Sequence, residues 1–96
     1  MTATLGPGPA GANSQLNITA ATVVKAAPGV LLSVSVIVAG SAAGGAYDTT
    51  TTGGAAAATQ IGTIPNTVGL IQFSWNCLNG IVIVPPTGGT VAVSFV

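Results

Sequence analysis

The stretch IQFSWNCLNGIVIVPPTGGTVAVSFV, residues 71–96, indicates the fold class of this chain. In its first part every second residue is apolar, namely Ile71, Phe73, Trp75 and Cys77, and the residues between them are polar. A period of two is typical of a β-strand with one buried face. The alternation therefore predicts a strand here, with Phe73, Trp75 and Cys77 in the core.

Asn79 and Gly80 predict a hairpin in the middle of this stretch. An Asn-Gly pair between two apolar runs favours a type I′ turn, because that turn needs positive φ at both central residues. Counting outward from the turn gives three expected pairs: Leu78 with Ile81, Cys77 with Val82, and Trp75 with Val84.

The rest of the stretch predicts two more strands. Residues 81–84 are apolar on both faces, as in a strand that is covered on both sides. Pro85 and Pro86 end this strand because proline cannot donate to a β-ladder. Alternation resumes over residues 90–96 and predicts a last strand there.

The same reasoning extends toward the N-terminus. Alternating β-branched residues predict a strand over residues 30–39, and a half-buried strand is expected to run from Leu16 to about Lys25. Pro28 and Gly29, which lie between these two strands, favour a type II turn with positive φ at the glycine.

The middle of the chain carries weaker signals. Residues 40–58 are mostly Ser, Ala, Gly and Thr, which predicts a loop with a short strand around residues 46–51. A further strand is expected over residues 59–64, with a turn at Pro65 and Asn66. Six to eight short strands with close turns predict an all-β protein. We expect a small antiparallel β-sandwich or jelly-roll-like barrel with little or no helix.

A chain of 96 residues accommodates one domain, which we place at residues 14–96. Residues 1–13 are rich in Gly and Pro and too poor in large apolar groups to form a core, so they predict a flexible arm that is either disordered or lies along a neighbouring subunit. Residues 1–12 also lack the cationic start and apolar run of a secretory signal, which predicts a chain that is made and assembled in the cytoplasm.

Lys25 and Asp48 are the only Lys, Arg, Asp or Glu residues in the chain, and there is no His. Catalysis and metal binding draw chiefly on those residue types, so we expect no enzyme activity, no catalytic residues, no cofactor and no metal. Nucleic-acid binding is also disfavoured, because one lysine cannot neutralise a row of phosphates. An uncharged surface favours a structural protein that contacts copies of itself or a larger assembly.

A few residues are candidate sites. Lys25 and Asp48 either form an ion pair between copies or remain solvated, and the solvated state is favoured. Residues 49–54, TTTTGG, are either a sugar-binding loop or a flexible one. The sequence Asn17-Ile18-Thr19 matches the N-glycosylation pattern, which we attribute to chance because no signal peptide is expected. Cys77 is expected to be a buried free thiol.

A membrane helix is the alternative for residues 26–47, which carry no charge and are long enough to span a bilayer. The Pro and Gly residues in this stretch and its period of two argue against a helix, and we expect no membrane partner.

The phrases LNITAATVVKAAPGVLLSVSVIVAGSAAGG (residues 16–45), YDTTTTGGAAAA, IPNTVG, NCLNGIVIVPPTGG and TVAVSFV resemble small Ala/Gly/Thr-rich β-proteins that tailed bacteriophages carry in their virions. The resemblance covers residues 16–96 and includes no catalytic motif. It implies a capsid decoration or cement protein, in the virion, that forms homo-oligomers and contacts a major capsid protein. A tail-fibre or receptor- or carbohydrate-binding domain is the alternative; it would show exposed aromatics or an ordered loop at residues 47–54.

Overall fold

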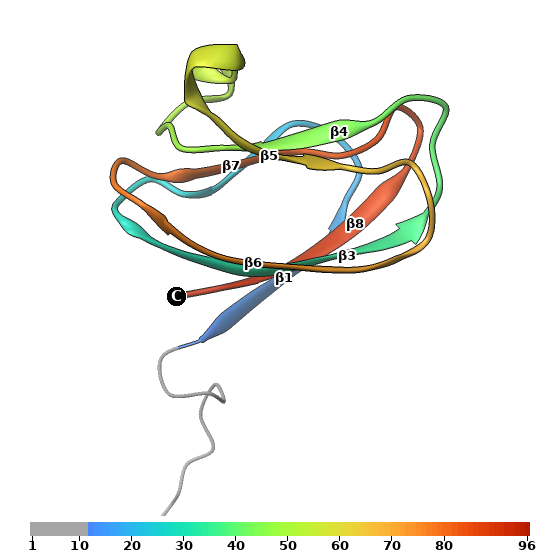
Figure 1. Cartoon of the computed structure of the whole chain (residues 1–96), viewed down its shortest axis with the longest axis horizontal. Coiled ribbons are helices and arrows are strands. Elements are labelled where there is room, and N and C mark those ends of the chain that lie inside the picture. Colours follow the sequence, from blue (N-terminus) through green and yellow to red (C-terminus); the bar gives the residue numbers. More distant parts are fainter. Residues whose placement is uncertain (1–11) are drawn as a thin grey trace, which may run out of the picture.

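Two four-stranded antiparallel sheets face each other in the structure, a computed structural model that describes residues 12–96 (Figure 1). The first sheet has the spatial order β1 (Asn13–Ile18), β8 (Thr90–Phe95), β3 (Gly29–Val38) and β6 (Gly69–Cys77). The second has the order β2 (Thr22–Lys25), β7 (Ile81–Val84), β4 (Gly44–Tyr47) and β5 (Gln60–Ile64). Two 3-10 turns, η1 (Thr52–Gly54) and η2 (Ala57–Thr59), are the helical segments of the described part of the chain.

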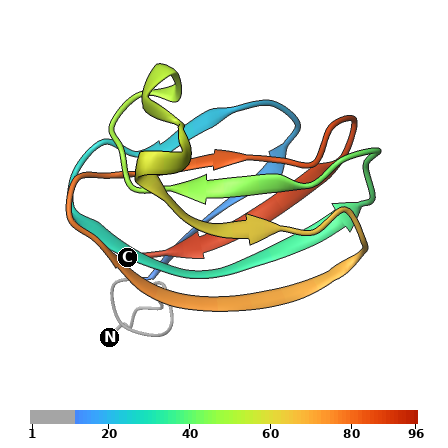
Figure 2. The ribbon, with the colours of Figure 1, turned by 45° about the horizontal axis from the view of Figure 1, so that its top comes forward.

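The order of the strands is that of a jelly roll. Apart from the β4–β5 connection, each consecutive strand changes sheet, so that neighbours in a sheet are distant in sequence. Figure 2 shows the two layers, with β4, β5 and β7 lying over β3, β6 and β8. Eight strands arranged as two interleaved Greek keys define the jelly-roll architecture. The expected all-β sandwich with little helix is confirmed.

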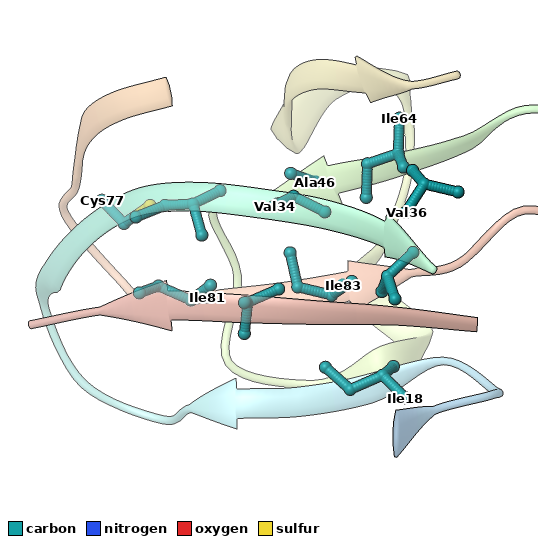
Figure 3. Close-up of a cluster of buried hydrophobic side chains, with 11 residues drawn as sticks. Ile18, Val34, Val36, Ala46, Ile64, Cys77, Ile81 and Ile83 are labelled. Atoms are coloured by element: carbon teal, nitrogen blue, oxygen red, sulfur yellow. The ribbon is translucent and has the colours of Figure 1, made fainter. Parts of the chain in front are cut away.

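The core lies between the sheets and is built from aliphatic side chains of both (Figure 3). Strand β7 contributes Ile81 and Ile83, and strand β3 contributes Val34 and Val36, all of them at most 1 % exposed. Close packing of such side chains is what holds the fold, because the one cysteine in the chain forms no disulfide. No buried side-chain N or O atom in residues 12–96 lacks a hydrogen-bond partner.

Strand β7 is covered on both sides, as its composition predicts. Val82 is fully buried, yet it does not belong to the cluster between the sheets. Its neighbours across the ladder are Val23 of β2 and Tyr47 of β4, so it is buried on the outer side of the second sheet. The β7 strand therefore has buried side chains on both faces of that sheet.

The predicted hairpin at Asn79 and Gly80 is wrong. Strand β6 pairs with β3 in the first sheet, whereas β7 pairs with β2 and β4 in the second. Residues 78–80 therefore cross between sheets, and neither Asn79 nor Gly80 has positive φ. Gly80 is required for space, because a Cβ atom would lie 2.5 Å from the Thr49 carbonyl oxygen and 2.7 Å from that of Lys25.

Trp75 is 48 % exposed, so its predicted place in the core is wrong. The other members of the alternation are more buried: Cys77 is 2 % exposed, and Phe73 packs partly against the core. The Phe73 ring lies close to Gly62 of β5, where a Cβ atom would collide with it. Trp75 is in register with Leu31, but β6 is an edge strand, so nothing beyond it in the sheet covers a side chain this large.

The single strand predicted from Leu16 to Lys25 is in fact two strands in different sheets. Asn17 has a φ of 57°, and the register with β8 shifts between Gln15 and Ile18, so β1 contains a bulge. Leu16 is consequently 70 % exposed, while Ile18 is 2 % exposed. The bulge and the bend after it could not be read from the alternation.

Other boundaries differ less. Gly29 begins β3 without positive φ, so the type II turn is wrong; a Cβ atom there would collide with the carbonyl oxygen of Val96. Strands expected at residues 30–39, 59–64, 81–84 and 90–96 are confirmed within about a residue. The short strand of the middle region is Gly44–Tyr47, earlier than expected.

The N-terminal arm and the helix alternative for residues 26–47 also differ from the structure. Residues 1–11 of the predicted arm lie outside the described residues, and its last two form the start of the domain: Ala12 is buried, and Asn13 pairs with Phe95 in β1. Residues 26–47 contain β3 and β4 and no helix, so the alternative of a helix there is wrong. Among residues 12–96 no helix has the length and apolarity to cross a membrane.

Candidate interaction surface

Asp48, directly after β4, holds the crossing between β6 and β7. Its Oδ1 accepts hydrogen bonds from the backbone N–H groups of Asn79 at 2.8 Å and Gly80 at 3.2 Å, and its Oδ2 accepts one from Leu78 at 2.9 Å. Burial alone would raise the pKa of Asp48, but these bonds and one from the Asn79 side chain outweigh it, so the pKa lies below the ordinary 3.8. Asp48 is thus a structural anion that links two segments of its own chain.

The threonine-rich loop after Asp48 is ordered by its own hydrogen bonds. Thr51 Oγ1 accepts from the Gly54 N–H at 3.1 Å, and Thr59 Oγ1 donates to the Gly54 carbonyl at 2.8 Å. The Asp48 N–H donates to the Thr59 carbonyl at 2.8 Å and closes the base of the loop. Figure 1 shows the loop, with η1 and η2, standing on the outer side of the second sheet. Two of its hydroxyls are therefore committed to the loop itself.

Tyr47 lies over Gly45 on the outer side of the second sheet. A Cβ atom at Gly45 would be 2.8 Å from the Tyr47 hydroxyl oxygen and 2.9 Å from the adjoining ring carbon. Glycine in a strand often marks such a close approach of an aromatic ring. Tyr47 is half-buried as a result, so the ring contributes to packing over β4.

Lys25 and Asp48 flank the crossing between β6 and β7. Lys25 ends β2, where its carbonyl oxygen lies next to Gly80, and Asp48 follows β4 and directs its carboxylate to residues 78–80. Asn17 and Thr19 are exposed at the end of β1. No group of three or more His, Cys, Asp or Glu residues gathers in residues 12–96.

Cys77 is expected to react with thiol reagents only after unfolding. Its side chain is 2 % exposed, and burial, followed by the negative charge of Asp48, raises the pKa of the thiol, so the reactive thiolate is scarce. Labelling with 5,5′-dithiobis(2-nitrobenzoate) at pH 8 should proceed at the rate of global or local opening, and at once in guanidinium chloride. Rapid stoichiometric labelling of the native protein would contradict the burial of Cys77.

Exposed apolar side chains gather at one edge of the first sheet. Seven large apolar residues are exposed in residues 12–96: Leu16, Ile37, Val38, Val68, Leu70, Trp75 and Leu78. All but Leu16 belong to β6, to the residues directly flanking it, or to the end of its neighbour β3. We call these six residues the β6 patch. In the ladder Leu70 is opposite Ser35, and Gly69 is opposite Val36, which places the end of β3 beside the start of β6. Trp75 and Leu78 lie at the other end of β6, where Trp75 is opposite Leu31.

The first sheet presents an uncharged surface. None of its four strands contains Asp, Glu, Lys or Arg. Ser33 and Ser94, opposite each other on β3 and β8, share a hydrogen bond of 3.1 Å between their hydroxyls. Small polar side chains and the β6 patch therefore form a surface that can be covered without removing a charge from water.

No protein-family model matches the chain, and searches of curated proteins and of solved structures likewise found no match.

The sequence contains a signal for the β6 patch that alternation alone does not reveal. Leu70 and Leu78 occupy the positions that Gln72, Ser74 and Asn76 fill elsewhere in the same strand, so they belong to its polar phase. A large aliphatic residue in the polar phase of a strand indicates either a second buried face or an exposed contact. In the structure Leu70 and Leu78 are exposed, because β6 is at the edge of its sheet.

Proposed function

We propose that this protein is a structural component of a tailed-bacteriophage virion, a decoration or cement protein that stabilises the capsid through contacts between its own copies and with the shell protein. The observation that carries the proposal is the surface of the first sheet: its strands contain no charged residue, and the β6 patch is exposed along one of its edges. Such a surface suits permanent contact with other protein, since apolar side chains are exposed and there is no charge to keep copies apart.

The architecture supports this proposal. Jelly rolls recur in viral capsid proteins and also in lectins, and a fold alone does not define a function. The scarcity of charge adds a chemical argument, because both strand addition and the packing of apolar patches work without ion pairs. The resemblance to phage virion proteins points in the same direction.

Copy number tests the proposal. Quantitative mass spectrometry of purified virions that encode this chain should find it at a copy number comparable with that of the shell protein. Virions that lack the chain should lose their DNA at lower temperature or at lower chelator concentration than complete virions. Absence of the chain from purified particles would refute the proposal.

A receptor- or glycan-binding domain of a tail fibre is the second candidate, favoured by two observations. Trp75 is 48 % exposed, and residues 48–59 form an ordered loop. Exposed aromatic rings stack on sugars through their apolar faces. This candidate predicts few copies per particle, and a change of Trp75 fluorescence when the protein is titrated with host surface polysaccharide; a Trp75→Ala variant should not bind.

A further inference from the structure

Strand β6 differs from the other edge strands of the molecule. The four edges are β1 and β6 in the first sheet and β2 and β5 in the second. Strand β6 has nine residues, whereas β2 has four and β5 has five. An edge strand carries unpaired backbone N–H and C=O groups along one side, and proteins commonly protect that side against further pairing.

The other edges carry such protection. Strand β2 is short and ends in Lys25, and β5 is directly followed by Pro65. Strand β1 contains the bulge at Asn17, where φ is 57°. Charge, proline, short length and bulges are the usual devices that prevent strands from pairing at an edge.

The first half of β6 has none of these devices. Residues 69–73 contain no charge and no proline, and they pair with β3 without a shift in register up to Gln72. Gly69 begins this half with a φ of 155°, and a bulge at Ser74, where φ is 50° and the register with β3 shifts, separates it from the second half. Leu70, 64 % exposed, lies within the unprotected half, and Val68, 69 % exposed, directly precedes it.

We propose that β6 is the site where a second copy of this chain adds, antiparallel and about a two-fold axis near Ile71, so that two first sheets join into one eight-stranded sheet. This inference rests on the proposed function as a self-assembling virion protein and names the surface that assembles. Strand addition supplies main-chain hydrogen bonds, and the side chains on either side of the new ladder give it specificity.

The second copy is favoured as occupant by the chemistry of the strand. A two-fold axis makes the contact isologous, so each copy offers the same uncharged strand and the same apolar patch. With the axis near Ile71, Leu70 of one copy is opposite Gln72 of the other, and the two Leu70 side chains become diagonal neighbours on the same face. Ile37, 54 % exposed on the adjacent β3, widens this contact. A charged partner would find no opposite charge in any strand of this sheet.

Sedimentation velocity over a range of concentrations tests the inference with matched variants. The unmodified protein should dimerise, and Leu70→Lys should raise the dimer dissociation constant about tenfold or more, because two ammonium groups become neighbours across the axis. Leu16→Lys is the control: Leu16 is 70 % exposed on β1, the opposite edge of the same sheet, and its variant should dimerise normally. Both variants should keep the melting temperature of the isolated domain at low concentration.

Charge complementation makes the test specific for the axis. Leu70→Glu alone should also be monomeric, and an equimolar mixture of Leu70→Glu and Leu70→Lys should recover dimers.

The results separate this inference from the proposed function. An unmodified protein that is monomeric at all concentrations, or a Leu16→Lys variant that loses dimers as Leu70→Lys does, overturns the assignment of β6. Particle binding by the Leu70→Lys variant is measured in parallel: retained binding leaves the proposed virion role intact while the dimer is lost. If dimers form through β6 but the chain is absent from virions, the proposed function fails and the β6 interface stands.

Discussion

Replacing Leu31 with Ala is expected to lower the free energy of unfolding by about 2–5 kcal/mol, among the largest effects that a single truncation can have in this protein. Leu31 is fully buried in β3 and belongs to the cluster between the sheets. Ala would remove most of the side chain and leave a cavity, because the rigid backbones of two sheets restrict collapse around it. Chemical denaturation followed by far-ultraviolet circular dichroism measures the change.

Trp75→Ala is the matched control for Leu31, since the two residues are opposite each other in the β3–β6 ladder. Trp75 is the larger side chain, but it is 48 % exposed, so its truncation should cost less than half as much as that of Leu31. Emission of native Trp75 at low protein concentration should be near that of a partly solvated indole. A larger loss of stability for Trp75→Ala than for Leu31→Ala would contradict the structure.

Asp48→Asn is the second substitution with a large expected effect, about 1–2 kcal/mol of stability at pH 7. The carboxylate accepts hydrogen bonds from three successive backbone N–H groups, those of residues 78–80. An Asn side chain has one oxygen, so its NH₂ group would face a backbone N–H and neither could accept. We place the cost at the lower end for charged hydrogen bonds because the bonds to Leu78 and Asn79 are exposed.

The same carboxylate predicts how stability depends on pH. The pKa of Asp48 is lower in the folded protein than its ordinary 3.8. Its contribution is therefore fully present above the unfolded pKa, and it is lost as the pH falls through the lower folded value. No other Asp or Glu exists in the chain, so melting temperatures between pH 7 and pH 2 isolate this one side chain.

The Asp48→Asn variant is the control for that titration, since it retains the chain termini and lacks only the carboxylate. Its melting temperature should change less on acidification than that of the unmodified protein, and the two curves should converge at low pH. Parallel curves from pH 7 to pH 2 would mean that the hydrogen bonds from residues 78–80 do not depend on the charge of Asp48.

Much of the β structure was predictable from side-chain periodicity. The alternation over residues 30–39 and 90–96 specifies strands, because period two with β-branched residues can bury one face only in extended backbone. The apolar run of residues 81–84 correctly indicated a strand covered on both sides. Both patterns are local: they show that a segment is a strand in some sheet, whichever strands are its neighbours.

The candidate surface was only partly predictable. The shortage of charge, with Lys25 and Asp48 alone, was visible in the sequence and already favoured contact with other protein. The role of Asp48 was not, because its partners at residues 78–80 are thirty positions away in the chain. A short polar side chain that hydrogen-bonds to a distant backbone segment produces no recognisable pattern in the sequence around it.

The sequence by itself determined that this protein is all-β, held by aliphatic packing and nearly free of charge. The tertiary structure alone decided which strands are neighbours. Asn79 and Gly80 have the composition of a hairpin turn, yet β7 does not pair with β6. In the second sheet β7 buries Ile81 and Ile83 against the first sheet and Val82 on the outer side of its own sheet. Burial of apolar surface is non-local and outweighs the preference of a two-residue turn, and it leaves β6, with Leu70 and Trp75, at an open edge.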